Sequence, residues 1–225
     1  MIMRYWYMDI KVDEHTVIVF DLDDTLYNEI DFLRSAYRDI AKYLEPVQWK
    51  RLYVLMFSLY RDKQDVFEVL AAKYNMDKKN LIMRYREHEP DIKLFPDVME
   101  KLTQIRDKNG FIAIVTDGRK KTQMLKIKAL GISKIVDRVV ISEEVGSEKP
   151  SIANFKIIED EFKKSTYYYI ADNLGKDFVT PNARGWKTIG LIDNGLNIHN
   201  NAYKHNKEQY IPHNFVSSFN EISIR

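Results

Sequence analysis

The stretch Thr16-Val-Ile-Val-Phe-Asp-Leu-Asp-Asp-Thr-Leu26 joins an apolar, β-branched run to a cluster of acidic residues. Residues 16–20 contain no polar side chain after the threonine, which is typical of a strand buried on both faces of a parallel sheet. The run ends at Asp21, and Asp23 and Asp24 follow within three residues. A strand that ends in carboxylates indicates a ligand site at the edge of the sheet.

Short apolar runs of this kind recur four more times, with helical segments as separators. Strand, helix and strand in repetition imply right-handed parallel crossovers, with helices on both faces of the sheet. The sequence therefore predicts an α/β fold with a doubly wound parallel sheet. The further predicted strands cover residues 111–115, 138–142, 167–170 and 188–192, and the predicted helices cover residues 97–108, 120–130 and 151–162.

An insert of about 60 residues between the first two strands breaks this alternation. Its apolar residues recur at helical spacing and it contains no glycine. This pattern favours a helix-bundle cap domain lying over the strand ends. The predicted cap covers residues 28–90, and the predicted core domain covers residues 1–27 and 91–225.

The composition excludes several classes of protein. None of the eight glycines precedes residue 110, which excludes a glycine-rich nucleotide loop after the first strand. Cysteine is absent, which excludes thiolate catalysis and thiolate metal sites. A net charge of +2 argues against nucleic acid as the main partner, and no run is long enough to span a membrane. Residues 1–11 lack the continuous apolar stretch of a signal peptide, so we expect a cytoplasmic monomer or homodimer.

Polar residues follow the ends of three predicted strands, and a lysine precedes Pro150. The carboxyl ends of parallel strands meet at one crevice, where these side chains should converge. Crowded carboxylates raise one another's pKa unless a cation lies among them, and oxygen ligands without sulfur or imidazole favour Mg2+. Such a site suits phosphoryl transfer. The candidate residues are Asp21, Asp23, Thr116, Lys149, Asp172 and Asp177.

Four motifs in this chain resemble those of the haloacid dehalogenase superfamily, in the same order. The resemblance covers residues 16–192, and the predicted helical insert occupies the place of the family's cap of the first type. The motifs are Phe20-Asp-Leu-Asp-Asp-Thr-Leu26, Ile114-Val-Thr-Asp-Gly118, Glu148-Lys-Pro150 and Ile170-Ala-Asp-Asn-Leu-Gly-Lys-Asp177.

The resemblance implies a role for each residue that would contact the phosphoryl group. Asp21 would attack phosphorus to form an aspartyl-phosphate. Asp23 would protonate the leaving oxygen and then deprotonate the water that hydrolyses this intermediate. Thr116 and the backbone amides of Asp117 and Gly118 would hold the phosphoryl oxygens.

The same resemblance implies a bound Mg2+. Its ligands would be the carboxylates of Asp21 and Asp172 and the main-chain carbonyl of Asp23. Asp177 would order the waters of the metal or the side chain of Lys149. Lys149 would neutralise both the nucleophile and the phosphate.

Two positions depart from the family pattern. Ala171 stands where glycine is usual, and Asp117 stands where asparagine is common. One added methyl group at Ala171 leaves the neighbouring metal ligand in place, and we expect activity to survive both departures. Asp117 would add a negative charge near the phosphate unless it turns outward or caps the helix that begins near Gly118.

Several other features favour structural roles. We expect Asp24 to cap the turn after the first strand, and Thr25 to be a turn or packing residue. The tail from Asp193 to Arg225 should add a small edge element and a short helix, without chemistry. Aromatic residues expected in the interior of the helix bundle are Trp49, Tyr53, Phe57 and Tyr60.

Two groups of basic residues are expected at the surface. The histidines are scattered without the paired spacing of a zinc site, and the basic run after Gly118 favours a solvated helix face. The histidines are His15, His88, His199, His205 and His213, and the basic run comprises Arg119, Lys120, Lys121, Lys126 and Lys128.

The sequence leaves three functions open. The first is a Mg2+-dependent phosphatase that acts on a small-molecule phosphate monoester, either a sugar phosphate or a nucleoside monophosphate. The second is a phosphomutase, which shares the same core. The third, a receiver-like signalling module, also uses a phosphorylated aspartate, but it needs neither the Asp172 and Asp177 pair nor a cap. Dehalogenation is disfavoured, because the family's dehalogenases lack a carboxylate at the position of Asp23.

Overall fold

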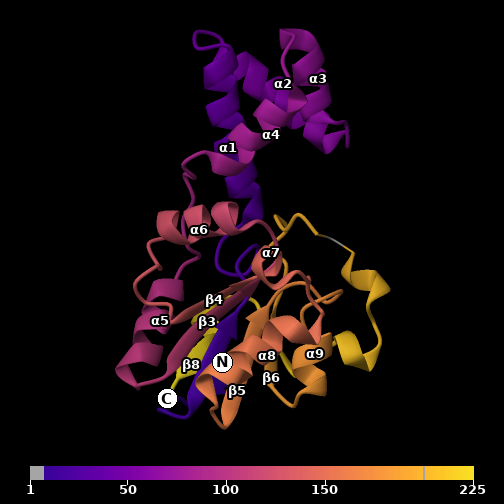
Figure 1. The fold of residues 1–225 in the computed structure, drawn as a ribbon. Helices are drawn as coiled ribbons and strands as arrows, with labels where there is room; N and C mark the ends of the chain where they lie inside the picture. The colour runs from indigo at the N-terminus through magenta and orange to yellow at the C-terminus, as the bar shows by residue number, and fades with distance from the viewer. Residues whose placement is uncertain (1–7, 200) are drawn as a thin grey trace, which may run out of the picture.

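A six-stranded parallel sheet forms the centre of the computed structural model, which describes residues 8–199 and 201–225 (Figure 1). Residues 1–7, which begin the predicted core domain and the segment compared with a signal peptide, lie outside the described residues. Each predicted strand is confirmed to within one residue at either end. Across the sheet the strands are β4 (Arg138–Ile141), β3 (Phe111–Thr116), β2 (Thr16–Phe20), β5 (Thr166–Ala171), β6 (Lys187–Leu191) and β7 (Asn214–Val216).

Helices cover both faces of this sheet, which confirms the doubly wound α/β fold. Along β2, Val17 and Val19 face one hydrophobic cluster, and Ile18 and Phe20 face another. The first cluster includes side chains of α8 (Ile152–Phe162), and the second includes side chains of α5 (Val98–Asp107) and α6 (Lys120–Ala129). Alternate side chains of a strand point to opposite faces, so one apolar run serves both cores.

The C-terminal tail supplies the last strand at one edge of the sheet, and short helices lie in the connections between the longer elements. β7 pairs with β6, as expected for an edge element, and β8 (Ile222–Ile224) pairs with β1 (Met8–Ile10) in a separate two-stranded sheet. In place of the expected single short helix, the described residues of the tail form three short 3-10 helices. They are η1 (Ala202–Lys204), η2 (Glu208–Tyr210) and η3 (Phe219–Glu221), and the short α-helices of the core are α7 (Ser142–Val145) and α9 (Val179–Ala183).

Strand order brings the predicted site residues together. The chain leaves β2 and forms β3 on one side of it and later β5 on the other side. Two crossovers in opposite directions from one strand open a crevice at the carboxyl ends. Asp21, Thr116 and Asp172 lie at the carboxyl ends of these three neighbouring strands.

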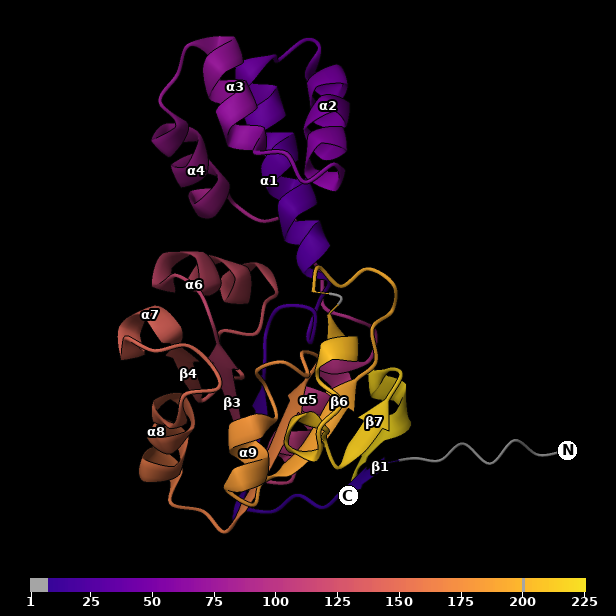
Figure 2. The same ribbon diagram turned by 90° about the vertical axis from the view of Figure 1, so that its right-hand side faces the viewer.

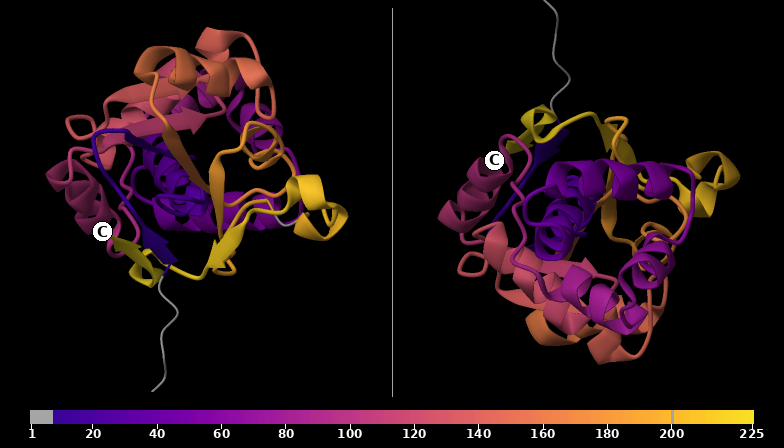
Figure 3. Two further views of the ribbon diagram at one scale, coloured as in Figure 1. Left: turned by 90° about the horizontal axis from the view of Figure 1, so that it is seen from below. Right: turned by 90° about the horizontal axis from the view of Figure 1, so that it is seen from above.

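Four helices between β2 and α5 lie over the carboxyl ends of the strands (Figure 3, right). They are α1 (Glu29–Leu44), α2 (Trp49–Arg61), α3 (Val66–Tyr74) and α4 (Lys78–Glu87). All four lie within the predicted cap and share a separate hydrophobic cluster. The side chains packed against this cluster include, as predicted, Trp49, Tyr53, Phe57 and Tyr60. No helix among the described residues is long and apolar enough to cross a membrane.

His88 is buried at the end of α4, so its predicted surface position is wrong. Its Nδ1 lies 2.9 Å from the carbonyl oxygen of Tyr85 and its Nε2 lies 3.1 Å from the Ser35 hydroxyl oxygen. Both ring nitrogens thus have partners, which removes most of the cost of burying an imidazole.

Met56 and Leu55 are neighbours on α2 that test the packing of the four helices. Met56 is fully buried in the helical cluster, whereas Leu55 is 39% exposed. We expect Met56→Ala to lower the free energy of unfolding by about 2–5 kcal/mol, because it removes buried methylenes and leaves a cavity. Leu55→Ala should change it by about 0.5 kcal/mol or less. Urea unfolding followed by circular dichroism measures both, and equal losses would contradict this packing.

Candidate active site

A cavity of about 360 Å³ lies at the carboxyl ends of β2, β3 and β5. The structure brings together there all the predicted site residues except Asp177, which lies fully buried behind the lining. The cavity is also lined by residues that the motifs did not mark as functional, including Glu29, Lys176 and His199. The charged lining fits a small, strongly polar ligand.

Lys149 is the central charge of this site. Its Nζ lies 2.6 Å from Asp21 Oδ1 and 2.6 Å from Asp177 Oδ1, and all three side chains are nearly inaccessible to solvent. Burial opposes the charge on Lys149, but Asp177 and Asp21 outweigh this effect and hold the Lys149 pKa well above its usual value. The lysine is therefore a fixed positive charge beside the predicted nucleophile.

Asp177 is positioned for Lys149 by two further donors. The hydroxyl of Tyr169 on β5 donates to Asp177 Oδ1 at 3.0 Å, and the backbone N–H of Asn173 donates to Asp177 Oδ2 at 3.0 Å. Of the two roles expected for Asp177, the structure shows the contact with Lys149.

Three carboxylates come close enough to share one cation. Asp21, Asp172 and Asp177 each offer an oxygen within 4.8 Å of the others. Burial raises the pKa of Asp21 to about 6, against the effect of Lys149. Burial, reinforced by Asp177 and Asp21, also raises the pKa of Asp172 well above its usual value. A divalent cation would relieve this repulsion, and a donor set of carboxylate oxygens fits Mg2+.

Asp172 is oriented by two residues whose part in the site was not predicted. The hydroxyl of Thr25 donates to Asp172 Oδ1 at 3.2 Å, and the side-chain amide of Asn197 donates to Asp172 Oδ2 at 2.8 Å. Thr25 is thus more than a turn or packing residue. Its place in the first motif was the only available sign of this role.

Asp23 turns its carboxylate toward α6. Lys126 Nζ donates to its Oδ1 at 2.7 Å, and the Tyr27 hydroxyl also donates to Oδ1. Gln123 Nε2 donates to its Oδ2 at 2.9 Å. Burial opposes the charge on Asp23, but these donors outweigh it and lower its pKa. The expected solvated position is therefore wrong for Lys126, because its ammonium group is buried against this carboxylate.

The second motif differs from expectation at Gly118 and Asp117. The backbone N–H of Gly118 donates to the Ser142 hydroxyl at 2.9 Å, so this amide is engaged within the protein. Asp117 neither turns outward nor caps α6. It accepts from the backbone N–H of Lys149 at 3.0 Å and from Lys176 Nζ at 2.9 Å, and Lys176 balances its charge.

The tail reaches the site, contrary to the prediction that it carries no chemistry (Figure 2). Besides the bond from Asn197 to Asp172, His199 lines the cavity while remaining exposed, as its predicted surface position requires. Asp24 accepts from the backbone N–H of Glu29 at 2.7 Å, so it caps the start of α1 and not, as predicted, the turn after the first strand, and it also accepts from that of Ile198 at 2.8 Å. An irregular segment carries no periodic signal, so pattern alone could not place it here.

Comparisons with known proteins agree with this geometry. The sequence model of the haloacid dehalogenase-like hydrolases matches residues 18–191. The chain belongs to this family, and the prediction of a hydrolase with this fold is confirmed. The HAD hydrolase YfnB from Bacillus subtilis, solved with bound magnesium, superposes with a TM-score of 0.65 at 18% identity, covering 92% of this chain and 96% of YfnB.

Two curated relatives are named as phosphatases. Glyceraldehyde 3-phosphate phosphatase from Methanocaldococcus jannaschii is 25% identical over 191 residues, which cover 78% of this chain and 84% of the relative. Pyrophosphatase PpaX from Bacillus pumilus is 23% identical over 192 residues, which cover 80% of this chain and 85% of the relative.

Protonation of Glu29 should make the stability of the folded protein depend on pH. Burial, reinforced by Asp23, raises its pKa from 4.5 to about 8. The folded state therefore keeps a proton that the unfolded chain loses, and wild-type stability falls as pH rises through this window. We expect Glu29→Gln to leave the Tm near the wild-type value at pH 4.5 and to raise it increasingly up to pH 8, without added Mg2+.

Thermal unfolding at pH 4.5, 6, 7 and 8 measures this difference. Glu100→Gln on the exposed surface of α5 is the matched control and should show no such trend. A difference between Glu29→Gln and wild type that stays constant with pH would contradict the assignment.

Proposed function

We propose that this hydrolase is a Mg2+-dependent phosphatase that releases phosphate from a small-molecule monoester through an aspartyl-phosphate. The observation that carries the proposal is the Asp21 carboxylate, which lies in a charged cavity beside Lys149 and within reach of two further acids. Phosphoryl transfer needs an aligned nucleophile and positive charge around the phosphoryl oxygens, more than it needs covalent assistance.

Each residue of the site has a separate role in the proposed reaction. Asp21 attacks phosphorus, while Lys149 neutralises the negative charge that the nucleophile and phosphoryl group bring together. Asp23 gives a proton to the leaving oxygen and later takes one from the attacking water. Thr116 contributes its hydroxyl to the phosphoryl oxygens.

Mg2+ would be held by Asp21 and Asp172, and by the main-chain carbonyl of Asp23. When bound, it would supply electrostatic stabilisation of the phosphoryl oxygens. Asp177 would act through Lys149, since its oxygens already accept from Lys149, Tyr169 and Asn173.

We favour a sugar phosphate over a nucleoside monophosphate as the substrate. The cavity of about 360 Å³ is within the range for small-molecule sites, about 300–1,000 Å³, and can take either. The relatives named for glyceraldehyde 3-phosphate and ribulose 1,5-bisphosphate support a short phosphorylated sugar. The cytoplasmic location and the monomeric or homodimeric state stay predictions.

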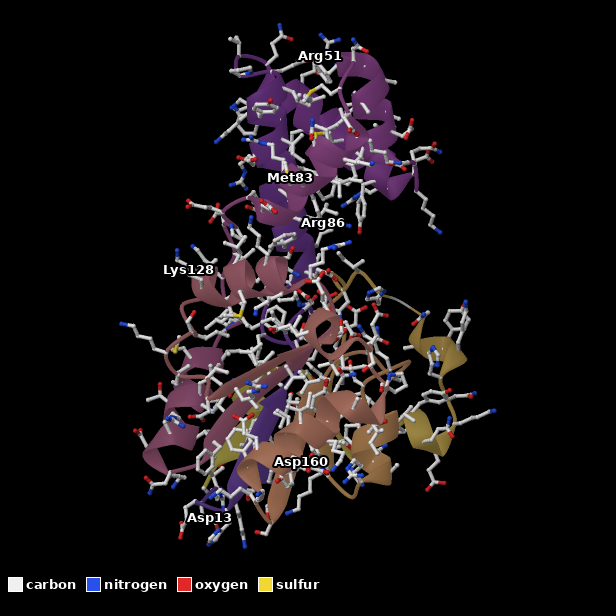
Figure 4. All side chains as sticks on the ribbon, viewed as in Figure 1. Asp13, Arg51, Met83, Arg86, Lys128 and Asp160 are labelled. Carbon is white, nitrogen blue, oxygen red and sulfur yellow. The ribbon has the colours of Figure 1, made fainter. Side chains whose placement is uncertain are left out.

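Substitution of the nucleophile tests the proposal. We expect wild-type protein to release phosphate from a panel of phosphate esters in the presence of Mg2+ and to lose this activity in EDTA. Asp21→Asn should lower kcat/KM by on the order of 10³-fold or more, because the amide cannot form the aspartyl-phosphate. Asp160→Asn on the exposed surface of α8 should keep wild-type activity (Figure 4). Equal phosphate release by Asp21→Asn and wild type would refute the role of Asp21.

The fate of the phosphoryl group separates hydrolysis from the phosphomutase and receiver alternatives. We expect a 32P-labelled ester to yield free phosphate at the rate at which it is consumed, because water is the final acceptor. Label that appears in a second ester would instead indicate a mutase. Label that stays on the protein with little turnover would indicate a receiver-like module.

A further inference from the structure

The Asp23 carboxylate is held by three donors, and two of them come from one helix. Lys126 and Gln123 lie three residues apart on α6, a spacing that places both on one face of the helix. Lys126 reaches Asp23 Oδ1 and Gln123 reaches Oδ2, so the two oxygens are fixed separately. The hydroxyl of Tyr27 completes the set at Oδ1.

Burial distinguishes Lys126 from the rest of the basic run, and Gln123 is buried beside it. Lys126 is 4% exposed and Gln123 is 2% exposed, whereas Lys128 on the same helix is exposed (Figure 4). Burying an ammonium group is costly unless it is paired, and Lys126 is paired only with Asp23 among the described residues. Its partner is the residue expected to move protons in the reaction.

Gln123 also contacts the phosphate-binding hydroxyl. The same Nε2 that donates to Asp23 donates to Thr116 Oγ1 at 2.7 Å. Thr116 Oγ1 accepts this bond and donates its own hydrogen to the carbonyl oxygen of Asp117 at 3.5 Å, a long contact that a phosphoryl oxygen could replace. One amide group therefore orients both a proton-transfer group and a phosphate-binding group.

We propose that Lys126 and Gln123 are positioning residues, which fix Asp23 so that its Oδ2 faces the leaving oxygen. This inference rests on the proposed phosphatase function. Oδ1 accepts two hydrogen bonds and Oδ2 accepts one, which leaves Oδ2 room for the proton that it transfers. Because its donors favour the ionised form, Asp23 first takes up a proton at Oδ2 when the ester binds. This proton passes to the leaving oxygen as the P–O bond breaks and the Asp21–phosphorus bond forms. The water that later attacks phosphorus returns a proton to Oδ2.

Lys126 also contacts the helical cap. Its Nζ lies 4.6 Å from the centre of the Phe32 ring, and Phe32 is a buried residue of α1. A cation over an aromatic face is an attractive contact. The same ammonium group thus touches the cap and the proton-transfer residue, so its position depends on both.

Aryl phosphates with different leaving groups test this inference. Nitrophenolate leaves readily without a proton, whereas phenolate depends more on the acid that protonates it. We expect Lys126→Met to lower kcat/KM about 10-fold more for phenyl phosphate than for p-nitrophenyl phosphate, because Asp23 is no longer aligned. Using kcat/KM restricts the comparison to steps up to loss of the leaving group.

Three further variants make the result decisive. Lys126→Arg, which keeps the charge, should restore most of the phenyl phosphate activity, and Lys128→Met should match wild type for both substrates. Gln123→Met should show the same selective loss if Lys126→Met proves too unstable to measure. A loss by the same factor for both esters, in either folded variant, would overturn the positioning role. Inactivity of Asp21→Asn toward both esters confirms that the measured hydrolysis occurs at this site, so failure of the proposed function is detected separately.

Discussion

The buried ammonium group of Lys149 is the interaction on which the rest of the site depends. It is paired with the carboxylates of Asp21 and Asp177. The Tyr169 hydroxyl accepts from Lys149 and donates to Asp177. Removing any single member would leave a buried charge or donor without its partner, which is far more costly than a typical surface substitution. The neighbouring Asp172 lies outside this pairing, so three clustered carboxylates face the one ammonium group that is paired with Asp21 and Asp177. The excess of negative charge is the physical reason to expect a cation.

Much of the fold could be predicted from sequence because its signals are local. Strands buried on both faces read as short apolar runs, and helices show their own spacing. Polar residues at the ends of such runs must meet wherever parallel strands lie side by side. Asp21, Thr116 and Asp172 were therefore predictable as neighbours, although they are far apart in the chain.

The contacts of α6 and of the tail could not be predicted in this way. A lysine in a helix is exposed in most proteins, so the sequence around Lys126 favours a solvated face until the position of Asp23 is known. Asn197 and His199 lie in a segment without periodicity, and nothing in their spacing relates them to Asp172. Asp117 was expected to add a negative charge near the phosphate unless it turned outward or capped a helix, but its charge is balanced by Lys176, four residues after the fourth-motif Asp172.

The two hydrogen bonds that Asp24 accepts make the helical cap and the C-terminal tail structurally dependent on each other. One carboxylate holds the first residue of α1 and the backbone of Ile198, so a segment near the end of the chain helps to anchor a unit inserted near its beginning. A cap exchanged as a cassette between relatives would arrive without the tail that it was matched to, and would lose the hydrogen bond that Asn194 donates to Asn28 at 2.8 Å and the packing of Ile198 against the helical cluster. Caps and tails of this kind should therefore be transplanted together, as one interface rather than as independent modules.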